Sequence, residues 1–260
     1  MYVTHVMPTP RPHNVLSAPL NSWLCASPKS MLKRFGATSE AVREVENAVE
    51  DLTSDLIRMH DGVLTAREEE FTSQLKSEIN LHLVNRIKER LNGKKIKDVE
   101  FKVHTYTKKQ EHGIGADFLG IIEIEVDKKK TIKSFLAQAK VGEYVSSGSG
   151  GFTARCYDTR LKNQIKNMLN ITSDSFVFMY TSGGVFVVPA LQAGITDSNS
   201  VSTDDYYYRS IGDFFGEFMK CFIGDHKIAH PDFSPQDLPM LAQKLDTEVS
   251  LFIQARAASA

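Results

Sequence analysis

The feature that most constrains the fold is a pair of strand-forming segments, residues 116–126 and 131–141, joined by the short charged turn 127–130. A connection of this length brings the two segments together as an antiparallel hairpin or meander. Successive side chains of a strand point to opposite faces, so one face of the first strand is apolar and carries Phe118, Ile122, Ile124 and Val126. The chain is therefore expected to build its core around a sheet.

Helical patterns surround this hairpin. The stretches 38–59 and 66–91 repeat apolar residues every three or four positions, as amphipathic helices do. The other expected elements are a strand at 96–106, a helix at 154–169, strands at 175–180 and 184–190, a surface loop at 196–205, and helices at 208–222 and 235–258. This order predicts an α/β protein in which a central mixed sheet is flanked by helices.

Length and composition narrow the class of protein. A chain of 260 residues, 42% hydrophobic and 24% charged, can bury a sizeable core as a soluble globular protein. We expect an N-terminal arm and helix over 1–60, a core over 61–195 and a helical C-terminal extension over 196–260. No stretch approaches the roughly 18 to 20 apolar residues of a membrane span, and the first residues do not resemble a secretory signal. The expected location is the cytoplasm, with no membrane partner.

Charge is distributed unevenly, although the net charge is only −1. Residues 86–140 hold 14 Lys and Arg against 8 Asp and Glu, whereas residues 197–260 hold 5 against 10. The central segment could therefore meet a phosphate backbone, and the C-terminal segment would repel one. A charge run is more often a solvated face than a binding surface, so this pattern only supports other observations.

Three polar residues of the hairpin are placed to converge. Asp117 opens the first strand on the face opposite Phe118. Gln138 and Lys140 are two residues apart in the second strand, so they project to the same side of the sheet. The Asp117 carboxylate, the Gln138 amide and the Ala139 backbone carbonyl are oxygen ligands that suit Mg²⁺ or Mn²⁺. A metal there would activate water for phosphodiester hydrolysis, and Lys140 would orient that water and stabilise the charge on phosphorus.

The order of these motifs along the chain is similar to that of a known protein family. Gly115-Ala116-Asp117, a strand, a turn and then Gln138-Ala139-Lys140 resembles the PD-(D/E)xK nuclease superfamily in its glutamine-lysine variant. Similar patterns occur in Mrr-like restriction nucleases and in nuclease domains of bacterial antiviral defence systems. The resemblance covers roughly residues 64–190 and implies a restriction-endonuclease-like fold, in which Gln164 would face the site. It departs from the parent motif at Gln138, which removes one negative charge from the metal site.

In this superfamily a glutamate on the preceding helix completes the metal site, and residues 67–75 resemble that element. Glu68 lies three and seven residues before Phe71 and Leu75, on the inward stripe of the helix, so we place it first. The alternatives are Glu69, Glu70 and Glu78.

The resemblance implies a Mg²⁺-dependent endodeoxyribonuclease with a role in antiviral defence or restriction. DNA is then the expected partner, together with a second copy of the chain or a regulatory or sensor protein. The lysines expected to contact the DNA backbone are Lys94, Lys95, Lys108 and Lys109. Two alternatives remain open: a non-catalytic module that keeps the nuclease fold, and a nuclease that acts on RNA or branched DNA.

Other chemistry-bearing residues make weaker patterns. Cys221, His226 and His230 have spacings that could supply zinc ligands but match no closed zinc site well. Cys25, Cys156 and Cys221 are too few and too widely spaced to indicate a disulfide framework. His104 and His112 lie in the segment that leads to Asp117 and could contact phosphate, but solvated loop histidines are the simpler interpretation. The glycine-rich stretch 146–151 lacks the ending of a phosphate-binding loop.

Overall fold

The computed structural model describes residues 36–59, 71, 74–75, 77–78, 82–93, 99–107, 115–126, 129–146, 152–195, 199–230, 232–247 and 249–257. Its main feature is a mixed seven-stranded sheet in the order β1-β10-β2-β3-β6-β7-β9. The strands are β1 (Val99–Thr107), β2 (Phe118–Val126), β3 (Lys129–Val141), β6 (Ser175–Thr181), β7 (Gly184–Pro189), β9 (Arg209–Ser210) and β10 (Val249–Ala257). The predicted hairpin is confirmed, because β2 and β3 are antiparallel with Phe118 opposite Ala137.

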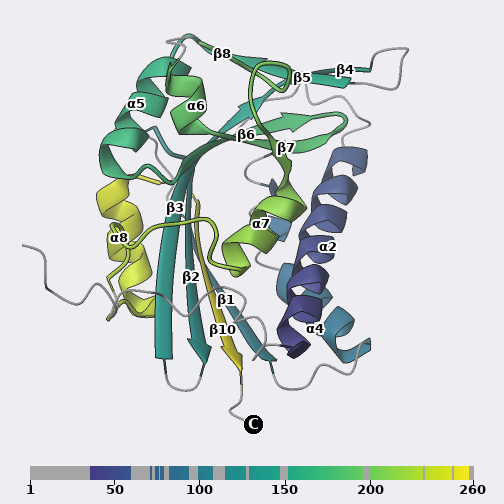
Figure 1. Ribbon diagram of the computed structural model, residues 1–260, viewed down its shortest axis with the longest axis vertical. Helices are drawn as coiled ribbons and strands as arrows, with labels where there is room; N and C mark the ends of the chain where they lie inside the picture. Colours follow the sequence, from purple (N-terminus) through teal and green to yellow (C-terminus); the bar gives the residue numbers. More distant parts are fainter. Residues whose placement is uncertain are drawn as a thin grey trace, which may run out of the picture.

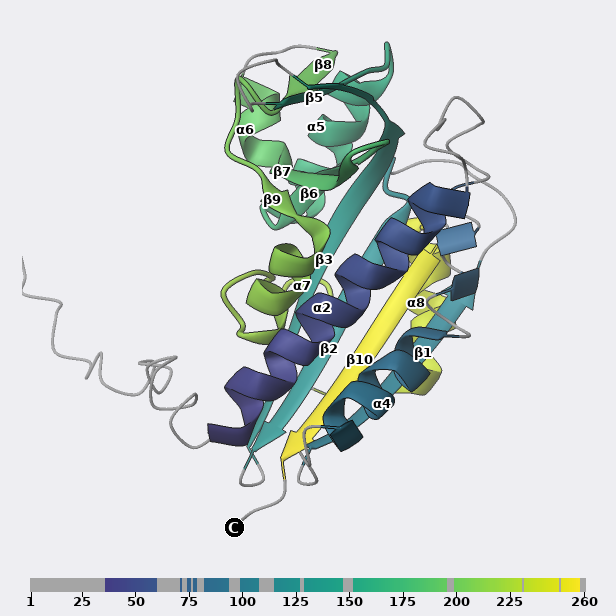
Figure 2. The same ribbon diagram turned by 90° about the vertical axis from the view of Figure 1, so that its right-hand side faces the viewer.

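Helices cover both faces of the sheet, which confirms the predicted mixed α/β architecture (Figures 1 and 2). One face, called the α2 face here, is covered by α2 (Gly36–Met59), α4 (Val84–Gly93) and α7 (Ile211–Met219). The opposite α5 face is covered by α5 (Leu161–Ile171), α6 (Ala190–Ile195) and α8 (Leu238–Leu245). Successive residues of β3 face these two layers in turn: Phe135 packs in the α2-face core and Leu136 in the α5-face core.

Phe135 is the centre of the α2-face core. Its ring centroid lies 4.9 Å from those of Phe214 and Phe218 on α7, both in edge-on contact. The residue opposite Phe135 on β2 is Gly120. A Cβ atom at Gly120 would lie 2.0 Å from Cε1 of Phe135, so this glycine leaves the space that the ring fills.

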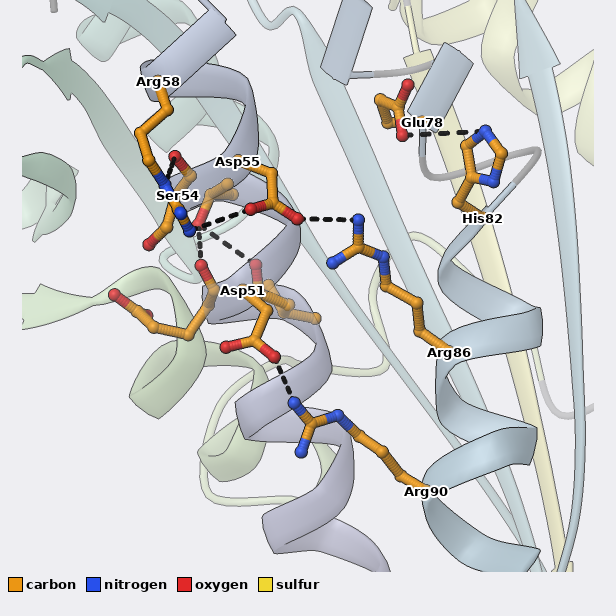
Figure 3. Close-up of polar contacts among 11 residues, drawn as sticks. Asp51, Ser54, Asp55, Arg58, Glu78, His82, Arg86 and Arg90 are labelled. Atoms are coloured by element: carbon orange, nitrogen blue, oxygen red, sulfur yellow. Dashed lines mark hydrogen bonds and ion pairs between the residues drawn. The ribbon is translucent and has the colours of Figure 1, made fainter.

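Ion pairs connect α4 to α2 along their solvent-facing edge (Figure 3). Arg86 lies 2.8 Å from Asp55, and Arg90 contacts Asp51. Arg90 also lies 3.3 Å from the carboxylate of Glu44, which is almost completely buried.

A second, three-stranded sheet lies above the main sheet in Figure 1. It consists of β4 (Glu143–Ser146), β5 (Phe152–Tyr157) and β8 (Ser200–Ser202). The prediction of a helix from residue 154 was therefore wrong for its first residues, and α5 begins at Leu161. In β5, Ala154 and Cys156 are buried whereas Arg155 and Tyr157 are exposed, and this period of two is typical of a strand. The predicted surface loop at 196–205 likewise contains β8.

The predicted helix at 235–258 was also wrong for most of its length. A 3₁₀ turn (Pro235–Asp237) leads into the short helix α8, which ends where Asp246 adopts a left-handed conformation with φ of 51°. The following residues form β10, which lies between β1 and β2, antiparallel to the first and parallel to the second. The C-terminal segment is therefore part of the central sheet and not a purely helical extension. In the described part of the chain, no helix combines the length and apolarity that a membrane span requires.

Candidate functional site

Asp117 lies at the start of β2, in the middle of the sheet. Its backbone N–H donates to Ala137 O of β3 at 2.9 Å, and its carbonyl accepts from Val249 N of β10 at 2.7 Å. The two neighbouring strands thus hold the backbone of Asp117, and its side chain is buried with 6% exposure. Two residues earlier, Gly115 has a φ of +81°, and a Cβ atom there would lie 2.8 Å from Cα of Gln164, so α5 packs closely against the segment that precedes Asp117.

Gln138 and Ala139 surround the Asp117 carboxylate. Asp117 Oδ2 accepts a hydrogen bond from Ala139 N at 2.8 Å and another from the side-chain amide of Gln138. The same Gln138 amide donates to Ala139 O at 3.0 Å. Gln138 Oε1 is buried and accepts no hydrogen bond from any residue that the structure describes. The carboxylate, the amide and the carbonyl named from the sequence therefore lie together.

Lys140 projects to the same side of β3 as Gln138, because Ala137, Ala139 and Val141 face the α2-face core. Its ammonium group lies 3.1 Å from Oδ2 of Asp158, in the turn between β5 and α5. Lys140 has an exposed fraction of 2%, so this is a nearly buried ion pair.

Asp158 has an unusual carboxyl pKa. Partial burial raises that pKa, but the backbone N–H and the side chain of Arg160, together with the charge and the hydrogen bond of Lys140, lower it to about 2. The carboxylate is thus ionised throughout the physiological range. Sequence reasoning missed Asp158 because the helix was expected to include it. The available signal was an acidic residue just before a helix, where backbone N–H groups have no partner within the helix.

The structure describes only one of the four glutamates that were predicted to complete the metal site. Glu68, Glu69 and Glu70 lie outside the described residues. Glu78 is described, and its carboxylate lies 3.9 Å from Nε2 of His82 (Figure 3). Over the ranges that the structure describes, no three His, Cys, Asp or Glu residues form a group that could hold a metal ion.

The structure describes only some of the remaining candidates. Lys94, Lys95, Lys108, Lys109 and His112 lie outside the described residues, as do residues 147–151 of the glycine-rich stretch. His104 packs against Phe252 at a ring distance of 6.0 Å. His226 and His230 are exposed, and the described chain does not gather them with Cys221 into a zinc-binding group.

Comparison with known proteins adds no relative. No family model matches the chain, no curated protein matches it significantly, and no solved structure does so either. The function must therefore be argued from the residues of the site.

Proposed function

We propose that the protein is a metal-dependent nuclease of the PD-(D/E)xK type that hydrolyses DNA phosphodiester bonds. The observation that carries the proposal is the close contact of Asp117, Gln138 and the Ala139 backbone where β2 begins. Lys140 is the next residue along β3 on the same face as Gln138. A carboxylate, an amide, a carbonyl and a lysine in this order fit the superfamily's glutamine-lysine variant. The mixed sheet with helices on both faces is compatible with its fold.

The donor set fits a hard divalent cation in part. Asp117 Oδ2 and Ala139 O both accept from the Gln138 amide nitrogen, and the buried Gln138 Oε1 has no donor among the described residues. Oxygen ligands of this kind suit Mg²⁺ or Mn²⁺, but only one of them is a carboxylate. Glu68 is the proposed source of a second carboxylate, as the resemblance implies. When bound, the cation would supply activation of water and neutralisation of phosphate charge.

Lys140 would provide fixed positive charge to the reacting phosphate. An ammonium group in a site with little water interacts more strongly with developing negative charge than one in bulk solvent. Its burial supports this role, because 2% exposure excludes most of the surrounding solvent. The proposed activity takes place in the cytoplasm, with DNA as substrate and a role in antiviral defence or restriction.

One observation favours a second candidate function. Asp117 and Lys140 are both nearly buried, and Lys140 is paired with Asp158. A site closed in this way also fits a nuclease-fold module that binds a partner or nucleic acid without cleaving it. It equally fits a nuclease that opens when a second copy or a regulatory protein binds.

A panel of substrates separates these functions. Purified protein is incubated with linear duplex, single-stranded and branched DNA and with RNA, each with Mg²⁺ or Mn²⁺, and Asp117→Asn is tested beside wild type. Cleavage of duplex DNA that Asp117→Asn abolishes supports the proposal. Binding without cleavage, unchanged in Asp117→Asn, supports the non-catalytic module, and preferential cleavage of RNA or branched DNA changes the substrate class.

A further inference from the structure

We propose that Asp158 is a positioning residue for Lys140. The carboxylate of Asp158 holds the ammonium group of Lys140 at the place from which that group acts on the phosphate. This inference rests on the proposed nuclease function. It assigns a role to a residue from outside the hairpin, since β4 and β5 separate Asp158 from Lys140 in the chain.

The ion pair restrains Lys140 more than an exposed pair would. The Nζ–Oδ2 distance is 3.1 Å, and the side chains of Lys140 and Asp158 have exposed fractions of 2% and 16%. A buried ammonium group is stable only when charged or polar partners replace the water that it has lost. The position of the Asp158 carboxylate therefore helps to determine the position of Nζ.

Asp158 is itself held from several sides. Its Oδ1 accepts from Arg160 N at 2.7 Å, its backbone carbonyl accepts from Leu161 N at 3.0 Å, and its backbone N–H donates to Asn199 O at 3.1 Å. The first two contacts belong to the start of α5, and the third belongs to the segment before β8. A carboxylate anchored on two elements can define a lysine position closely, which a reactive site requires.

A purely structural role for Asp158 makes a different prediction. If the residue only satisfied the N–H group of Arg160, an asparagine would replace it, because the side-chain amide oxygen accepts the same hydrogen bond. Asp158→Asn keeps the shape and this acceptor but removes the charge that faces Lys140 and the exposed guanidinium group of Arg160, of which only the Lys140 contact is nearly buried. The variant therefore separates the two roles.

The first arm of the test measures cleavage of plasmid DNA with Mg²⁺ by wild type, Asp158→Asn, Asp158→Glu and the control Asp204→Asn. Asp204 is an exposed residue whose carboxylate accepts a hydrogen bond from the hydroxyl group of Thr153 on β5, in the three-stranded sheet. We expect Asp158→Asn to lower kcat by about 10- to 100-fold and to change KM by less than about threefold. Asp158→Glu should recover part of the loss, and Asp204→Asn should match wild type. Wild-type kcat in Asp158→Asn would overturn the proposal.

The second arm needs no activity. Melting temperatures are compared for wild type, Asp158→Asn, Lys140→Met and the double variant. If the two side chains interact, Asp158→Asn lowers the melting temperature less in the Lys140→Met background than in wild type. Equal losses in both backgrounds would contradict the positioning. If the two substitutions have non-additive effects on the melting temperature but the protein cleaves no nucleic acid, the proposed nuclease function is overturned. The restraint of Lys140 by Asp158 is then still supported.

Discussion

The side chain of Gln138 donates a hydrogen bond to the carboxylate of Asp117 on the neighbouring strand. An acidic residue at position 138 could offer no such donor at neutral pH and would add a second negative charge. The glutamine therefore stabilises the buried carboxylate of Asp117, while its own carbonyl oxygen stays buried without a donor from the described residues. This arrangement leads directly to a test of the proposed metal site.

Gln138→Glu is expected to make stability depend more strongly on divalent cations. Two adjacent buried carboxylates repel each other, so the variant should melt at a lower temperature than wild type in EDTA. A cation bound between them removes this repulsion, so added Mg²⁺ should raise the melting temperature of the variant more than that of wild type. Gln243→Glu, on the exposed side of α8, is the control. An equal response of all three proteins to Mg²⁺ would argue against a cation at Gln138.

Gly120→Ala is expected to destabilise the core by about 1–3 kcal/mol, because the new methyl group overlaps the ring of Phe135. Urea unfolding measures the loss. The cost should shrink in a Phe135→Leu background, since the two residues are in contact. Gly194→Ala on α6, where a Cβ meets only side-chain atoms at 3.2–3.3 Å, serves as control. A Gly120→Ala protein as stable as wild type would contradict the packing described for Phe135.

The two arginines of α4 should differ in their effect on stability. Arg90→Ala removes a partner from the buried Glu44 and is expected to cost about 1–3 kcal/mol. Arg86→Ala breaks a half-exposed pair with Asp55 and should cost at most about 1 kcal/mol. Urea unfolding at low and high salt checks both variants, and the Arg86 contribution should weaken with salt. Equal costs would show that the burial of Glu44 is unimportant.

Asp158 should make stability fall at acid pH. Its carboxyl pKa is about 2 in the folded protein against a usual value of 3.8, so the unfolded chain binds the proton first. The contribution, about 2 kcal/mol, is fully present above pH ~4 and is lost as pH falls towards ~2. Asp158→Asn should flatten the fall in the free energy of unfolding over this window. Parallel pH profiles of variant and wild type would contradict the lowered pKa.

Local patterns in the sequence predicted much of the fold. The β2–β3 hairpin, α2, β6 and β7 were all predicted close to their observed bounds, because their apolar periodicity or turn signals lie within the segment itself. β10 was mistaken for a helix because such local patterns are absent from a strand that is buried on both faces. Leu251 and Phe252 are both buried, one on each face of the sheet, so a central strand shows no alternation of apolar and polar residues.

The candidate site divides in a similar way. Asp117 and Gln138 could be paired from the sequence because a hairpin fixes which residues are opposite. The contact between Lys140 and Asp158 could not, because it depends on how β4 and β5 leave the main sheet and return the chain to α5. Contacts of that kind follow from tertiary packing and leave no periodic signal.

Cleavage of supercoiled plasmid DNA by the purified full chain tests the central claim most directly. Wild type, Asp117→Ala, Lys140→Ala and the exposed-lysine control Lys166→Ala are each incubated with Mg²⁺, Mn²⁺ or EDTA, and folding is checked by circular dichroism. We expect wild type and Lys166→Ala to nick or cut the plasmid with metal and not in EDTA. The site variants should be folded and at least about 100-fold slower. Cleavage by Asp117→Ala or Lys140→Ala at the wild-type rate, or cleavage that persists in EDTA, would contradict the proposed site.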